Sequence, residues 1–323
     1  MAEKRVVTIG GGTGTFVVLS GLRTLPEVAL TAIVTASDDG GSTGRLRDAY
    51  GFLPPGDARQ ALVALAEDRD VMRELFAYRF SKGDVAGHNL GNLLITALTD
   101  ILGSDEKAFS EVSKILRVKG KVIPATEKPA TLQALLTDGT TVVGENMIST
   151  IPETPRAPIQ ALSLSEPLPL THSAREAILE ADTVILGPGR LYSSTIAALL
   201  PEGMKEALEQ TSAKILYVAN LFTCAGETDR YPLSKHVAEI SAYAGRTLDT
   251  IFVDQGTFTD EVLAWYAQEQ EFPLVDDMAE DVRVVRLPLA SVNVVPPIEN
   301  DPVRRSLMRH DFEKLKDALA PYL

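Results

Sequence analysis

Short runs of apolar, often β-branched residues alternate along the chain with longer segments whose apolar positions recur at helical spacing. The first run covers residues 6–9, a helical pattern follows over residues 16–22, and a second apolar run covers residues 32–35. This alternation is typical of βαβ units. It predicts a mostly parallel sheet flanked by helices.

The same alternation continues past the middle of the chain. Further apolar runs predict buried strands at residues 183–186, 214–218, 250–253 and 282–287. Helical spacing recurs at residues 173–180, 234–243 and 260–269, and again at residues 303–319, which end the fold. The sequence therefore predicts an α/β protein with a modified Rossmann-like, doubly wound sheet.

The pattern changes between residues 121 and 170. Short strand-like pieces at residues 141–143 and 159–164 are separated by prolines and glycines, without a helix of useful length. We interpret this segment as a β-rich insertion in a single domain that spans residues 1–323. Pro152, Pro155 and Pro158 leave open a linker between two domains, although strand signals resume at once after them.

Composition narrows the classes of partner. The net charge is -13 and no cluster of Lys and Arg interrupts it, which argues against a nucleic-acid or anionic-membrane surface. No apolar run approaches the roughly 20 residues of a membrane span, and no signal-peptide pattern opens the chain. The single cysteine, Cys224, excludes an internal disulfide. We expect a cytoplasmic protein that binds small molecules or proteins.

A glycine-rich turn, Gly10-Gly11-Gly12-Thr13-Gly14, directly follows the first predicted strand and precedes a helix. Glycines let the backbone approach a phosphate, whose charge is stabilised by the amides and dipole of the helix N-terminus. Thr15 replaces the third glycine of the dinucleotide fingerprint, and no P-loop Gly-Lys-Ser/Thr follows. The turn predicts phosphate binding, with a merely tight strand-to-helix turn as the other interpretation.

The second predicted strand leads into Ser37-Asp38-Asp39-Gly40-Gly41-Ser42-Thr43-Gly44-Arg45. A carboxylate at this strand end meets a ribose hydroxyl in Rossmann-like sheets. Asp38 and Asp39 could instead bind Mg²⁺, which makes them candidate catalytic and metal-binding residues, or lie in a solvated turn. We include Ser42 and Arg45 among the candidate nucleotide-binding residues, because an arginine here suits bidentate phosphate contact.

Two later segments carry polar groups at predicted helix starts. Asp57 and Gln60 have the spacing of a capping box, in which Asp57 accepts from the Gln60 amide. His88, Asn89 and Asn92 precede or begin a helix over residues 93–102, where they could bond a base, sugar or phosphate. His88 is as consistent with a structural role as with a general base, because no nucleophile pattern accompanies it.

A second glycine turn, Gly187-Pro188-Gly189-Arg190-Leu191-Tyr192-Ser193-Ser194, follows another strand and leads to a helix at residues 195–200. Two such turns in one sheet indicate a ligand across its carboxyl edge, at a switch point of strand order. Asn220 and the segment Gly226-Glu227-Thr228-Asp229 come after the next strand and extend the rim of this site. A tight turn without a ligand is again the other interpretation.

Together these segments resemble the YvcK-type gluconeogenesis factors, within the superfamily of the CofD-like phospholactate transferases. The resemblance runs from residue 6 to residue 256 and includes Pro54-Pro-Gly-Asp57, Pro124-Ala-Thr126 and Gly144-Glu145. It implies a modified Rossmann fold, a homodimer and binding of a nucleotide sugar such as UDP-N-acetylglucosamine. It also implies a role in cell shape or wall-precursor balance during gluconeogenic growth. Arg190 departs from the family, which usually has a small hydroxyl residue there.

Three functions remain open at this point. In the first, the two glycine turns hold the pyrophosphate of a nucleotide sugar, and occupancy alters a surface that binds an unidentified regulatory protein. In the second, Asp38 or Asp39 holds magnesium in a phosphotransferase that acts on a deazaflavin alcohol. The third, binding of NAD or another dinucleotide, is weakened by the incomplete fingerprint.

Overall fold

A seven-stranded parallel sheet forms the centre of the computed structural model, which describes residues 3–67, 70–151, 156–294 and 306–323. Its strands are β1 (Lys4–Ile9), β2 (Val28–Val34), β3 (Lys121–Pro124), β7 (Thr183–Leu186), β8 (Lys214–Val218), β9 (Thr250–Asp254) and β10 (Val284–Leu287). Their spatial order is β10-β9-β8-β7-β1-β2-β3, and all neighbours pair in parallel. Strand order reverses between β1 and β7, which places the switch point there.

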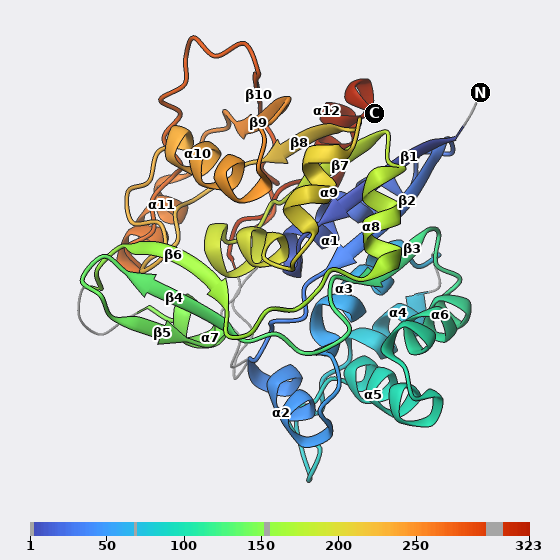
Figure 1. The fold of residues 1–323 in the computed structure, drawn as a ribbon. Coiled ribbons are helices and arrows are strands. Elements are labelled where there is room, and N and C mark those ends of the chain that lie inside the picture. The colour runs from blue at the N-terminus through green and yellow to red at the C-terminus, as the bar shows by residue number, and fades with distance from the viewer. Residues whose placement is uncertain (1–2, 68–69, 152–155, 295–305) are drawn as a thin grey trace.

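Helices cover both faces of this sheet (Figure 1), as the doubly wound pattern predicts. One face carries α1 (Gly12–Leu22), α3 (Pro55–Leu65), α6 (Asp105–Leu116) and α12 (Phe312–Leu319), with α2 (Gly41–Tyr50), α4 (Asp70–Ala77) and α5 (Leu90–Leu102) packed outside α3. The other face carries α8 (His172–Leu179), α9 (Met204–Gln210) and α10 (Leu233–Ala244). Adjacent residues of β1 serve opposite cores, since Val6 packs on one face and Val7 on the other.

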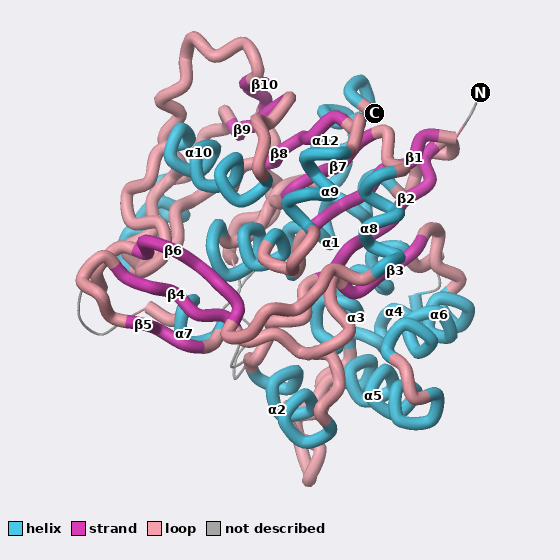
Figure 2. The backbone as a smooth tube through the Cα atoms, viewed as in Figure 1, coloured by secondary structure: helices cyan, strands magenta, loops and turns pink. Residues whose placement is uncertain are grey.

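The predicted β-rich insertion forms a small antiparallel sheet beside the main one (Figure 2). It consists of β4 (Leu132–Leu136), β5 (Thr141–Val143) and β6 (Ile159–Leu164), in the order β5-β4-β6, with the short helix α7 (Glu145–Ser149). Residues 121–124, which the sequence pattern groups with the insertion, pair instead with β2 at the edge of the main sheet. The insertion therefore begins after Pro124. Pro152 and Pro155 lie outside the described residues.

Several helix boundaries correct the expectations from sequence. The capping box at Asp57 is wrong, because α3 begins at Pro55 and Pro54 is its N-cap residue. The helix expected at residues 195–200 starts earlier, as a π-helical turn (Leu191–Ile196) followed by a 3-10 turn (Ala197–Leu199). The C-terminal helix starts only at Phe312, and residues 303–305 of that prediction lie outside the described residues.

The last elements of the chain are α11 (Asp260–Gln268), β10, α12 and a final 3-10 turn (Ala320–Tyr322). Helix α11 packs against Leu221 and Phe222, which follow β8. In the part of the chain that the structure describes, no helix is both long enough and apolar enough to cross a membrane.

Candidate functional site

A cavity of about 540 Å³ opens beside the switch point of the sheet. Many of the predicted site residues line it: Gly11, Gly12, Thr13, Gly14, Asp38, Ser42, Asp57, Asn92, Gly189 and Arg190. The other predicted residues do not: Gly10, Asp39, Arg45, His88, Asn89, Gly187, Leu191, Tyr192 and Asn220. The cavity lies within the range of volumes typical of small-molecule sites.

The first glycine turn presents backbone amides to this cavity. Gly12 N donates to Asp57 Oδ1 at 2.8 Å, and Asp57 Oδ2 accepts from Thr35 Oγ1 at 2.7 Å. A Cβ at Gly11 would lie 1.9 Å from Asp57 Oδ2, so only glycine allows this contact. The next two amides, of Thr13 and Gly14, have no acceptor among the described residues. They therefore remain available to a ligand at the N-terminus of α1.

The second glycine turn packs directly against the first. A Cβ at Gly14 would lie 1.9 Å from the Pro188 carbonyl oxygen, which explains the glycine there. Ser194 Oγ donates to Gly11 O at 3.4 Å, so the two turns also meet through a hydrogen bond. The Gly187–Pro188 peptide is cis, and Gly187 has a φ of 72°.

Side chains from later segments occupy the amides of the second turn. Gly189 N donates to Asn220 Oδ1 at 3.0 Å. The buried Glu227 carboxylate accepts from Ser193 N at 3.2 Å and Ser193 Oγ at 2.8 Å, and it also pairs with Arg190 Nη1 at 3.1 Å. These contacts hold the second turn in place, and the Arg190 side chain extends from it.

Three carboxyl groups, of Asp38, Asp57 and Glu145, form part of the cavity wall. Burial, reinforced by the charge of Asp57, raises the pKa of Asp38 to about 7. Burial, reinforced by the charge of Asp38, raises the pKa of Glu145 to about 8, and burial also raises the pKa of Asp57. Near neutral pH this wall therefore holds protons that ordinary carboxylates would have lost. Ser37 Oγ lies in the same wall, buried and without a partner among the described residues.

The Asp39 carboxylate caps helix α7, a role that the sequence pattern does not suggest. Its Oδ2 accepts from Glu145 N at 3.0 Å and its Oδ1 from Asn146 N at 2.7 Å, so it holds the N-terminus of α7. Arg190 Nη1 donates to Ser149 O at 2.7 Å at the other end of that helix. The two contacts fix α7, and with it Glu145, against the cavity.

These positions decide which residues fit Mg²⁺. Within the described ranges, no group of three His, Cys, Asp or Glu side chains is arranged to hold a metal ion. Asp39 does not fit as a ligand because α7 uses both of its oxygens. Asp57 is used in the same way, because its oxygens accept from Gly12 N and Thr35 Oγ1. Asp38 fits better, provided that water or ligand phosphate supplies the remaining ligands, as is usual for Mg²⁺.

The polar residues at the start of α5 connect helices behind the cavity. Ser42 Oγ lies 3.1 Å from His88 Nδ1, and Asn89 accepts from Asn92 N at 3.1 Å as the N-cap of α5. Asn92, which reaches the cavity wall, accepts from Arg59 Nε at 2.9 Å. Burial, with nearby arginines, lowers the pKa of His88. Leu191 and Tyr192 are buried in the core, so their side chains do not face the site.

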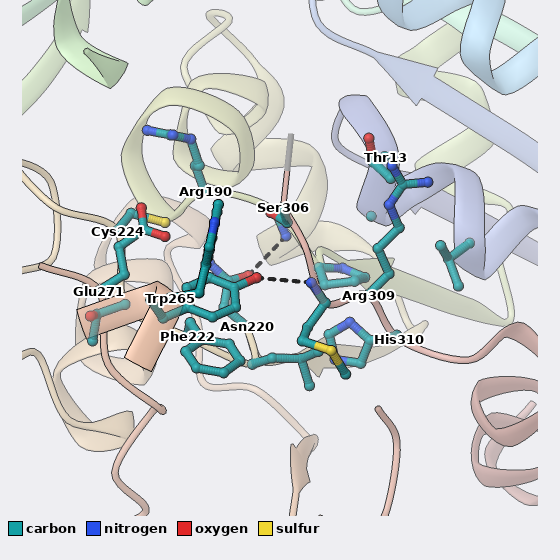
Figure 3. A pocket seen from close by; sticks show the side chains of 18 residues that line it. Thr13, Arg190, Asn220, Phe222, Cys224, Trp265, Glu271, Ser306, Arg309 and His310 are labelled. Atoms are coloured by element: carbon teal, nitrogen blue, oxygen red, sulfur yellow. Dashed lines mark hydrogen bonds between the residues drawn. The ribbon is translucent and has the colours of Figure 1, made fainter. Parts of the chain in front are cut away.

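A second cavity, of about 140 Å³, adjoins the first, and Figure 3 shows the side chains that line it. Its wall includes Phe222, Trp265 and Tyr266, and Phe222 stacks on Tyr266 with ring centroids 3.7 Å apart. Asn220 lies in this wall, and Figure 3 shows Arg309 extending toward Thr13. The two cavities share five wall residues: Thr13, Gly14, Gly189, Arg190 and Ser306.

Sequence reasoning missed this aromatic cavity and the roles of Glu145 and Glu227. Glu145 belongs to a motif of the family resemblance, and Glu227 to a segment expected on the rim, but neither was assigned chemistry. The aromatic residues come from two segments that no motif connects, 222 and 265–266. Only the fold brings them to the carboxyl end of β8.

The sequence matches the family model described as "2-phospho-L-lactate transferase CofD" over residues 6–295. This chain belongs to the CofD family. Among CofD-family proteins it is similar to the gluconeogenesis factors of Halalkalibacterium halodurans and Bacillus subtilis. The first is 39% identical over 321 residues, covering 99% of this chain and 96% of the relative. The second is 39% identical over 330 residues, covering 100% and 99%.

Comparison with a solved structure supports the fold independently of the family model. A member of the UPF0052 family from Bacillus halodurans superposes with a TM-score of 0.89 at 37% identity, covering 99% of both chains. The predicted fold class and family resemblance are therefore confirmed.

Proposed function

We propose that this CofD-family protein is a regulator that binds a nucleotide sugar of the UDP-N-acetylglucosamine type. One observation carries the proposal: two cavities of different chemistry meet at the N-terminus of α1. A ligand that occupied both would have an aromatic end, an anionic middle and a polar end.

Each part of such a ligand has a matching part of the site. The rings of Phe222, Trp265 and Tyr266 suit a nucleobase, which stacks on aromatic side chains. The open amides of Thr13 and Gly14, at the positive end of the α1 dipole, suit a diphosphate. The hydroxyl- and carboxyl-lined wall suits a sugar, because protonated carboxyl groups both donate to and accept from hydroxyls.

The regulatory part of the proposal rests on the relatives. Two of them carry the name gluconeogenesis factor and match this chain over nearly its whole length. We extend that role to this chain, with ligand occupancy linked to growth on gluconeogenic carbon sources and to the balance of wall precursors that shapes the cell.

The test is calorimetric titration of the purified protein with UDP-N-acetylglucosamine, GDP and NAD, with and without Mg²⁺. We expect saturable, Mg²⁺-independent binding of the sugar nucleotide. Trp265→Ala should weaken it by about tenfold or more through lost base stacking. Tyr50→Ala, which removes an exposed ring elsewhere, is the matched control. An absence of saturable binding by the wild type would refute the proposal.

A phosphotransferase is the second candidate, favoured by the name of the family model and by the Asp38 carboxyl group in the cavity wall. Such an enzyme would use Mg²⁺ to neutralise charge on the transferred phosphoryl group. Selective Mg²⁺-dependent binding of GDP, followed by turnover of a deazaflavin alcohol that Asp38→Asn abolishes, would establish it over the regulator.

A further inference from the structure

We propose that Arg190 selects a diphosphate-bearing ligand in this protein, by binding the phosphates with the guanidinium nitrogens that the fold leaves open. The inference rests on the proposed function and assigns one part of its ligand to one residue. The proposed contact is made by the side chain of Arg190, not by the backbone of the second glycine turn.

Two contacts place Arg190 beside the N-terminus of α1. Pro188, two residues before it, touches Gly14 so closely that a Cβ there could not fit. Ser194, four residues after it, donates to Gly11 O. Arg190 is thus held between two anchors on the first turn, and it lines both cavities at the place where they meet.

The guanidinium is already oriented by the protein. Its Nη1 donates to Ser149 O at 2.7 Å and to Glu227 Oε1 at 3.1 Å. Because the group is planar, fixing one nitrogen restricts the others. Across the described ranges, Nη2 and Nε have no hydrogen-bond partner, and the side chain is 26% exposed. A phosphate can therefore meet two aligned donors at little further cost in side-chain entropy.

Arg59 and Arg79 line the larger cavity but not the smaller one, so neither lies where the two cavities meet. Arg59 donates to Asn92 Oδ1 and to Phe76 O, and Arg79 Nη1 donates to Gly87 O. The carboxyl groups of Asp38, Asp57 and Glu145 also line the larger cavity, and any of them that ionises would repel an anion. Glu227 offsets the charge of Arg190 through Nη1, but the guanidinium still presents Nε and Nη2 as donors to an anion at the junction.

The experiment compares UDP with uridine, which lacks the phosphates, on three proteins by calorimetry. Arg190→Met keeps the aliphatic stem and removes the charge, whereas Arg190→Lys keeps the charge and removes the planar fork. We expect Arg190→Met to weaken UDP by about tenfold or more while uridine changes less than about twofold. Arg190→Lys should fall between the two, and the loss should shrink as salt is added.

Equal weakening of UDP and uridine would overturn the assignment, because Arg190 would then only support the fold. Unchanged UDP binding would overturn it as well. Both outcomes leave the proposed function intact, because titration with UDP-N-acetylglucosamine tests it separately. A wild type that binds UDP-N-acetylglucosamine but not UDP would overturn the assignment of Arg190 alone. If Arg190→Met fails to fold by circular dichroism, the ratio of UDP to uridine affinity in Arg190→Lys decides, and an unchanged ratio contradicts the assignment.

Discussion

The two glycine turns look alike in sequence and differ in structure. Both follow a parallel strand next to the switch point, and both lead into a helical segment. The first leaves the amides of Thr13 and Gly14 open, whereas the second gives those of Gly189 and Ser193 to Asn220 and Glu227. A glycine after a strand therefore indicates close backbone approach but not what approaches, since Gly11 and Gly14 are met by Asp57 and Pro188 of the protein itself. What distinguishes the first turn is that two of its amides stay open.

The largest expected effect comes from removing the support of the second turn. Glu227→Ala leaves the buried donors of Ser193 without an acceptor and Arg190 without its counter-charge. We expect the free energy of unfolding to fall by about 3 kcal/mol, toward the lower end for a broken buried pair because Arg190 is partly exposed. Urea denaturation measures it. Glu227→Gln, which keeps an acceptor, should lose less; equal stability of Glu227→Ala and wild type would show that the turn needs no such support.

The contact between the turns gives a smaller effect on stability and a large one on binding. In Gly14→Ala the new methyl group meets the Pro188 carbonyl, so one turn must move. We expect a loss of about 1–3 kcal/mol in unfolding free energy and loss of nucleotide-sugar binding. Gly40→Ala is the control, since its Cβ would lie an ordinary 3.4 Å from Asp38 Oδ1. Normal ligand affinity in Gly14→Ala would mean that the turns need not touch.

The Glu145 carboxyl group in the cavity wall gives stability a dependence on pH. The raised pKa of Glu145, about 8 against an ordinary 4.5, means that the folded state retains a proton that the unfolded state loses. Stability from this group is full below pH 4.5 and declines as pH rises toward 8. Glu145→Gln cannot ionise and should gain stability relative to wild type between pH 5 and pH 8, as measured by thermal unfolding. A pH-independent difference would contradict the burial of this charge.

Local pattern was enough for six of the seven strands of the central sheet; the exception is β3, which the pattern groups with the insertion. The strands at residues 183–186 and 250–253 are buried throughout, and in the strand at residues 214–218 only Lys214, at its start, is exposed. Helix α2 was missed because Gly41, Ser42, Thr43 and Gly44 are poor helix formers. Its first turn packs against the preceding backbone instead, where a Cβ at Gly44 would lie 2.0 Å from Asp39 O.

Longer-range contacts could not be read from sequence. The groups that hold the second turn lie 31 residues on, in Asn220, and 34 residues on, in Glu227. Asp39 accepts from an amide 107 residues away, so its role as the cap of α7 has no local signal. At Asp57 the capping-box spacing indicated the wrong helix start. Proline is favoured at the first helical position, so the helix begins at Pro55, before the Asp57 carboxylate.

The clamped position of α7 has a consequence for the order in which the chain is synthesised. The first glycine turn and its acidic neighbours are complete once residue 57 has been made, but Glu145 closes over them only after residue 149, and Arg190 secures that closure later still. During translation the amides of Thr13 and Gly14 are therefore made long before the walls that would shape a binding cavity around them. A nascent chain released before residue 190 would carry the glycine-rich motif without the cavity that the complete fold builds around it.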